Sequence, residues 1–152
     1  MKHQMPIRRA IAADTETVRA IALAAYAKYL SRMGRAPAPM VADFAGHISR
    51  DEVVVIEDDG ALHGFMIAWP EADAYVVDNL AVHPAVQGKG FGRKLIEYAV
   101  IAARQLGLPA LRLYTNVAMH ENLAWYRRIG FVETHRAMEN GFDRVYMRWD
   151  FS

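Results

Sequence analysis

One stretch decides the fold of this chain: Leu80-Ala81-Val82-His83-Pro84-Ala85-Val86-Gln87-Gly88-Lys89-Gly90-Phe91-Gly92-Arg93. It is typical of a strand that ends at a proline, a turn with three glycines, and the first turn of an amphipathic helix. Glycines at such a turn leave backbone N–H groups unpaired, and the helix N-terminus adds partial positive charge. The sequence therefore predicts a turn that holds phosphate.

The segments on either side of this turn predict one α/β domain over residues 1–152 with a mixed sheet. Two turn dipeptides, Asp59-Gly60 and Asn140-Gly141, predict hairpins. The expected elements are a strand at 5–12, a helix behind Asp14 as N-cap, a short helix at 41–48, strands at 53–56, 62–69 and 75–82, a helix at 91–106, a strand at 111–114, a helix at 121–128, and strands at 131–135 and 144–151. The order is β-α-α-β-β-β-α-β-α-β-β, with a right-handed crossover between the parallel strands.

Composition excludes several classes of function. The formal net charge is +1, so no global field favours nucleic acid or membrane partners. The chain has no cysteine, which excludes disulfides, thiolate metal ligands and thiol nucleophiles. Scattered histidines without paired spacing predict no metal site. No apolar run approaches the roughly 18 residues of a membrane span, and the first residues lack the apolar core of a signal peptide, so a cytoplasmic protein is expected.

Three kinds of phosphate turn can be compared with the glycines. A Walker loop requires Ser or Thr after Gly-Lys, but Gly90 follows Lys89. A dinucleotide fingerprint has the pattern Gly-x-Gly-x-x-Gly and lies early in its fold. Here the last glycine, Gly92, lies two residues after Gly90 and not three, and four expected strands precede the turn. The remaining pattern is Gln-x-x-Gly-x-Gly, which begins at Gln87.

This pattern resembles the acetyl-CoA motif of the GNAT superfamily of N-acetyltransferases. A second block is similar to the family's Tyr-x-x-x-Gly-Phe helix and strand: Glu121-Asn122-Leu123-Ala124-Trp125-Tyr126-Arg127-Arg128-Ile129-Gly130-Phe131. The order of elements also matches over nearly the whole chain. The resemblance implies a GNAT-like acyl-CoA N-acyltransferase fold, and a direct transfer of acetyl from acetyl-CoA to a primary amine of a small molecule, peptide or protein.

The resemblance also implies a donor site. The pyrophosphate would rest on the N–H groups of residues 88–93, with charge from Lys89 and Arg93 and a side-chain bond from Gln87. The pantetheine arm would pair with the strand at Leu80, and the N–H of Val82 would stabilise the oxyanion. The full set of expected donor-binding residues is Leu80, Ala81, Val82, Gln87, Gly88, Lys89, Gly90, Phe91, Gly92, Arg93 and Asn122.

The catalytic groups expected beside this site are a tyrosine and an aspartate. Tyr126 matches the motif tyrosine and is the candidate acid that protonates the departing thiolate, although its spacing also suits a core position. Asp78 is the only acid between Tyr75 and Val82, and it is expected to relay a proton or bind a cationic amine. An exposed strand position is the alternative for Asp78.

One position departs from the family pattern. Seven residues before the tyrosine, where the family often has Asn, this chain has Met119. Asn116 and Asn122 are nearby, and Asn122 is expected either to contact CoA or to cap its own helix. The amine acceptor itself cannot be identified from the sequence.

Two other classes of function compete with catalysis. One is a non-catalytic acyl-CoA-binding module, and the other is a different nucleotide-binding domain that uses the same turn. The last strand, at 145–151, is long and aromatic, and as a sheet edge it would invite a homodimer.

Overall fold

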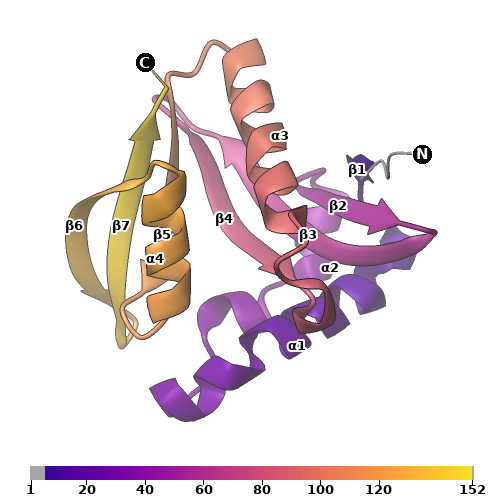
Figure 1. Ribbon diagram of the computed structural model, residues 1–152, viewed down its shortest axis with the longest axis horizontal. Helices are drawn as coiled ribbons and strands as arrows, with labels where there is room; N and C mark the ends of the chain where they lie inside the picture. Colours follow the sequence, from indigo (N-terminus) through magenta and orange to yellow (C-terminus); the bar gives the residue numbers. More distant parts are fainter. Residues whose placement is uncertain (1–5, 152) are drawn as a thin grey trace.

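A seven-stranded mixed sheet runs through the molecule, with its strands in the order β1-β2-β3-β4-β5-β7-β6 (Figure 1). The computed structural model describes residues 6–151. Its strands are β1 Ile7–Arg9, β2 Val53–Asp58, β3 Ala61–Pro70, β4 Tyr75–Val82, β5 Ala110–Asn116, β6 Val132–Glu139 and β7 Phe142–Asp150. Its helices are α1 Thr15–Met33, α2 Phe44–Ser49, α3 Phe91–Gln105 and α4 His120–Ile129, with short 3₁₀ turns at Ala12–Asp14, Ala38–Val41 and Pro84–Val86.

The helices lie on both faces of the sheet and divide the core in two. On one face, Leu95 of α3 and Leu123 of α4 pack with Val77 of β4. On the other face, Tyr29 of α1 and Phe44 of α2 pack on the opposite side chains of the central strands. In the described part of the chain, no helix is long and apolar enough to cross a bilayer.

The two predicted hairpins are confirmed. Asp59 and Gly60 join β2 to β3 with φ of 52° and 79°, and Asn140 and Gly141 join β6 to β7 with φ of 52° and 81°. Two consecutive left-handed residues make a turn whose twist matches the strands, and Asp-Gly and Asn-Gly pairs adopt it at low cost.

The feature that positions the site is a gap between β4 and β5. These parallel strands pair only at Tyr75 with Leu111 and at Val76 with Arg112. Two residues further along β4, the pairing with β3 slips, so that Asp78 is an extra residue in the β4 strand. A bulge of this kind bends its strand. The second half of β4 therefore diverges from β5 and leaves an opening through the sheet.

Some sequence predictions were wrong in detail. The last strand is not a sheet edge: β7 lies between β5 and β6, because it pairs with β5 from Ala110–Asp150 to Asn116–Arg144 and also forms the hairpin with β6. The edge strand on that side is β6. The expected helix at 41–48 begins only at Phe44, after a separate 3₁₀ turn. The predicted first strand is shorter than expected, and its first residue lies outside the described residues.

Asp14 precedes α1 as predicted, but its side chain does not cap that helix. Asp14 has helical backbone angles, so its carboxylate faces back and accepts hydrogen bonds from the Ile11 N–H and the Arg8 guanidinium. Burial opposes ionisation, but the Arg8 hydrogen bonds dominate and lower the Asp14 pKa. The carboxylate therefore fastens β1 to the start of α1.

Candidate active site

The glycine turn presents a row of backbone N–H groups at the start of α3. Gly88 and Gly90 have φ of 83° and 91°, which a residue with a side chain adopts only with strain. The first backbone bond of α3 runs from Lys94 N–H to Gly90 C=O. Within residues 6–151, the N–H groups of residues 88–93 make no hydrogen bond. With the helix dipole behind them, these groups form an anion-binding concavity.

A cleft of about 460 Å³ extends from this turn between α3 and α4. Gly92 lets α3 approach α4 closely at this cleft, because a Cβ at this position would lie only 3.3 Å from the Trp125 ring of α4. Every donor-side residue predicted from the sequence other than Lys89 lines this cleft. Its lining residues are Ala25, Tyr26, Lys28, Tyr29, Leu80, Ala81, Val82, Val86, Gln87, Gly88, Gly90, Phe91, Gly92, Arg93, Glu121, Asn122, Trp125, Tyr126 and Arg128.

The end of β4 forms one wall of the cleft with backbone groups. His83 N–H donates to His63 C=O of the neighbouring strand. Because residues of an antiparallel strand alternate in direction, Leu80 and Val82 direct their N–H and C=O groups away from β3, toward the gap. The Gln87 amide donates to Val82 C=O at 3.2 Å. Its nitrogen is thus engaged in closing the turn, which differs from the predicted bond to phosphate.

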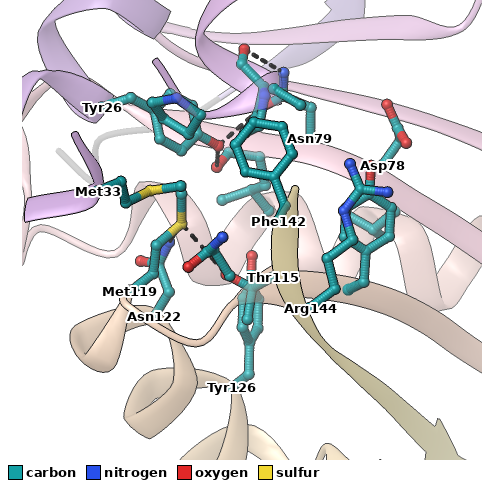
Figure 2. A pocket seen from close by; sticks show the side chains of 17 residues that line it. Tyr26, Met33, Asp78, Asn79, Thr115, Met119, Asn122, Tyr126, Phe142 and Arg144 are labelled. Carbon is teal, nitrogen blue, oxygen red and sulfur yellow. Dashed lines mark hydrogen bonds between the residues drawn. The ribbon is translucent and has the colours of Figure 1, made fainter. Parts of the chain in front are cut away.

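A second, smaller cavity of about 40 Å³ lies at the same gap (Figure 2). Its walls come from α1 and the loop after it, from β4 and β5, from α4, and from β7 of the β6–β7 hairpin. Four residues line both the large cleft and this cavity: Tyr26, Leu80, Asn122 and Tyr126. The two spaces therefore meet through the opening between β4 and β5.

Tyr126 lies at this junction. Its side chain is 7% exposed and contacts Trp125 and Phe131. Its hydroxyl makes no hydrogen bond within the described residues. The hydroxyl oxygen is still partly accessible from the cleft, so it is not a fully buried polar atom without a partner. Burial raises the Tyr126 pKa well above its ordinary value, so that the phenol holds its proton at neutral pH.

Asp78, the bulged residue of β4, lines the smaller cavity and not the large cleft. Desolvation raises the pKa of this carboxyl, while the charges of His47 and Arg144 oppose that shift. Within residues 6–151 no group hydrogen-bonds to it. The structure thus brings Asp78 and Tyr126 to one cavity, with the end of β4 between them.

A comparison with protein families agrees with this arrangement. Residues 49–133 match the model of the acetyltransferase (GNAT) domain, a span that includes the gap, the glycine turn and α4. The chain belongs to the GNAT family. The resemblance seen in the two sequence motifs is thereby confirmed.

Two curated GNAT-related sequences match parts of the chain. The putative [ribosomal protein bS18]-alanine N-acetyltransferase of Bacillus subtilis (strain 168) is 28% identical over 98 residues, which are 62% of this chain and 65% of that protein. The mycothiol acetyltransferase of Propionibacterium freudenreichii subsp. shermanii is 37% identical over 62 residues, 41% of this chain and 19% of that protein. The chain thus spans less than two thirds of either relative's length.

Solved structures share the GNAT fold over nearly the whole chain. The PaiA N-acetyltransferase of Thermoplasma acidophilum, in complex with coenzyme A, superposes with a TM-score of 0.78 at 17% identity and covers 97% of this chain and 99% of its own. The putative acetyltransferase yncA of Salmonella typhimurium, with acetyl-CoA, gives a TM-score of 0.68 at 24% identity over 97% and 94% of the two chains. The α/β mixed-sheet fold predicted from the sequence is confirmed.

The departure from the GNAT motif at Met119 now has a structural setting. Met119 is buried at the start of α4, and its sulfur accepts from Thr115 Oγ1 at 3.4 Å and from Asn122 Nδ2 at 3.7 Å. Asn122 does not cap the helix, and its side chain lines both the cleft and the cavity. Asn116 accepts from Ala118 N–H in the turn before α4.

A buried hydrogen-bond chain at the junction was missed by sequence reasoning. The single O–H proton of Tyr26 is shared between two acceptors, Asn79 Oδ1 at 2.8 Å and Leu80 C=O at 3.1 Å. The Asn79 amide in turn donates to Pro39 C=O at 2.9 Å. These hydrogen bonds link α1, the end of β4 and the loop after α1. The sequence signal was a helical tyrosine, Tyr26, and an asparagine, Asn79, in a largely apolar strand, and only the tertiary fold brings these two residues together.

Proposed function

We propose that this GNAT domain is an acetyl-CoA-dependent N-acetyltransferase that transfers acetyl directly to a primary amine within a ternary complex. The observation that carries the proposal is the junction of the two spaces at the gap in the sheet, where Leu80 and Tyr126 face both. A donor held in the large cleft and an amine held in the small cavity would meet there without a carrier residue on the enzyme.

The donor side has the groups that such a ligand requires. The unpaired N–H groups of residues 88–93 and the Arg93 guanidinium suit the pyrophosphate. The outward backbone of Leu80 and Val82 suits the amides of the pantetheine arm. When bound, acetyl-CoA supplies an activated acetyl group on a thiol leaving group. The N–H of Val82 is assigned to the negative charge that develops on the carbonyl oxygen.

The chain's own residues then account for the protons. The acceptor enters as an ammonium ion, and Asp78 binds it and accepts a proton directly or through water. The neutral nitrogen attacks the carbonyl carbon, the carbon–sulfur bond breaks, and Tyr126 donates its proton to the departing thiolate. The nitrogen releases its second proton, and one proton returns to the Tyr126 phenolate. Amide, thiol and one net proton result.

The main competing function is a non-catalytic acyl-CoA-binding module. Such a module needs the glycine turn but no acid at the junction, and this chain places the Tyr126 phenol there. The chain also lacks cysteine altogether, so a cysteinyl-acyl route is excluded. Both observations favour catalysis by direct transfer.

Two measurements test the proposal together. Acetyl-CoA at saturating concentration should raise the melting temperature, because a ligand bound to the folded state must stabilise it, whereas ATP and NAD should not. An amine and peptide screen should release free CoA thiol with at least one acceptor. Stabilisation without any thiol release would favour the binding module, and no stabilisation by acetyl-CoA would reject the donor assignment.

A further inference from the structure

Arg144 of β7 reaches into the acceptor cavity with part of its hydrogen-bonding capacity unused. Its side chain is 13% exposed, and its guanidinium carbon lies 4.4 Å from the centroid of the Tyr114 ring. Nη1 donates to Glu139 Oε1 at 3.3 Å. The Tyr146 hydroxyl is a further polar neighbour of this guanidinium. Within residues 6–151, no hydrogen bond of 3.5 Å or less joins Nε or Nη2 to another group. These two nitrogens form the edge of a guanidinium that binds a carboxylate with two parallel bonds.

Asp78 supplies the opposite charge in the same cavity (Figure 2). Its carboxylate interacts with the charge of Arg144 through space, without a hydrogen bond between them. Partly buried charged groups usually have hydrogen-bond partners. Within the described residues, Asp78 has no hydrogen-bond partner and Arg144 has one, Glu139, although both side chains line one space of about 40 Å³.

We propose that the acceptor is an α-amino acid, whose ammonium group binds Asp78 and whose carboxylate binds the Nε–Nη2 edge of Arg144. This inference rests on the proposed acetyltransferase function. The two charges of an α-amino acid are separated by one carbon, which suits a small cavity with two opposite charges. Met33 and Phe142, which also line it, offer apolar contacts to the amino acid's side chain.

The charges around the cavity disfavour a polyamine. At its rim Arg35 lies over Phe142, with its guanidinium carbon 3.9 Å from the ring centroid, and Nη1 donates to Asn140 C=O. A second ammonium group on an extended acceptor would be repelled where it approached Arg35, whereas the charge of Arg144 is paired with Glu139. The proton balance is that of the general reaction: the ammonium nitrogen loses two protons, the thiolate gains one, and the carboxylate stays ionised on Arg144.

The first experiment compares acceptors with and without the carboxylate. Thiol release from acetyl-CoA is measured with the twenty standard amino acids. The best substrate is then compared with its carboxamide, with the amine that lacks its carboxyl group, and with spermidine. We expect kcat/KM for the free acid to exceed that for the carboxamide by at least about tenfold, because a charge-assisted hydrogen-bond pair is lost.

The second experiment assigns that preference to a residue. Arg144→Gln should lower kcat/KM for the free acid by at least about tenfold and change that for the carboxamide little, so that the preference disappears. Arg148→Gln is the matched control on the same strand, since Arg148 bonds to Asp73 and Asp150 and does not line the cavity. This control should keep the full preference. Melting temperatures with and without acetyl-CoA verify that each variant is folded.

Several outcomes would overturn the inference. They are equal use of acid and carboxamide, turnover of spermidine or peptide amines but of no α-amino acid, and a preference that survives Arg144→Gln. In these cases the acetyltransferase function stands. If no amine is acetylated, the inference also fails, and the acetyl-CoA melting shift then shows whether the donor assignment survives.

Discussion

At the scale of single residues, Tyr126 has the most specific proposed role, that of the acid for the departing thiolate. Its phenol is buried, keeps its proton at neutral pH and borders both the large cleft and the smaller cavity. Tyr126→Phe should therefore lower kcat by about 100-fold, the usual contribution of a general acid, while the acetyl-CoA melting shift remains. Tyr98→Phe on α3, outside both spaces, is the control. An unchanged kcat for Tyr126→Phe would leave the thiolate without its assigned acid.

Asp78 allows a prediction on activity against pH. Desolvation raises its pKa, so the ionised form, which we propose binds and deprotonates the amine, is lost as pH falls through that raised value. The kcat/KM of the wild-type chain should therefore show an acidic limb above the ordinary aspartate pKa. Asp78→Asn should lower kcat/KM and remove that limb. If the same limb persists in the variant, another group titrates there.

The same residue should show a cost in stability. A carboxyl whose pKa is higher in the folded than in the unfolded state destabilises the fold when ionised, and this effect is complete above the folded pKa. Asp78→Asn should thus raise the melting temperature at pH 7. The gain should shrink as pH falls through the raised folded pKa and vanish below about pH 3, where the carboxyl is protonated in both states. A variant less stable than wild type at pH 7 would contradict the desolvated setting of Asp78.

The positions of single residues at the site were predictable to the extent that a local motif contains them. Tyr126 and the glycines follow from spacing alone. Arg144 does not, because it reaches the cavity only through the pairing of β7 with β5 opposite Asn116. Asp78 was selected as the only acid between Tyr75 and Val82, but the β-bulge that makes it an extra residue of β4 has no local sequence signal.

At the scale of elements, the turn from β4 into α3 depends on left-handed glycines. Gly90→Ala should cost about 1–2 kcal/mol of stability, because φ is 91°, and should weaken acetyl-CoA binding by about tenfold, since the neighbouring N–H groups must reorient. Gly60→Ala, in the β2–β3 turn, is the matched control. Its φ is 79°, and a Cβ added there, as at Gly90, would meet no atom within 4 Å. It should lose similar stability and bind acetyl-CoA normally. Equal binding by both variants, measured by calorimetry, would argue against phosphate at this turn.

Most helices and strands were predictable because Gly, Pro and Asx residues mark their ends. The strand Tyr75–Val82 has the bounds that the sequence predicted. The helix expected at 91–106 ends at Gln105, just before the left-handed Gly107. The position of β7 inside the sheet was not predictable, because it depends on pairing with β5, which lies more than twenty residues earlier in the chain. Side-chain use within turns, as at Gln87, likewise depends on contacts that spacing does not encode.

At the scale of the whole molecule, the β1–β4 part of the sheet and the β5–β7 part are joined by a short stretch of strand pairing. Two residue pairs join β4 to β5, and Arg32 of α1 bonds to Glu121 of α4 on the other side of the opening. Acetyl-CoA bound between them should slow amide hydrogen exchange over residues 80–93, because it would bond the outward groups of β4 and the turn. The β2–β3 hairpin should exchange as before. Protection confined to the hairpin, or absent from 80–93, would contradict the proposed binding mode.

Association between copies is also a property of the whole molecule. A homodimer formed by pairing of sheet edges would use β6, since β7 has partners on both sides. Glu133 and Arg136 of β6 pair with each other on its exposed surface. Charged side chains on an edge strand oppose pairing with another chain.

The opening through the sheet has an evolutionary consequence. The large cleft and the smaller cavity share four lining residues, and α1, β4 and α4 contribute to both. The loop after α1, β5 and β7 line only the smaller cavity, and the glycine turn lines only the large cleft. The loop after α1 and the β6–β7 hairpin can therefore accumulate substitutions that alter the acceptor while the thioester-handling half keeps its shape. An enzyme divided in this way can be retargeted to new amines by exchanging two short segments, and it need not re-evolve its chemistry.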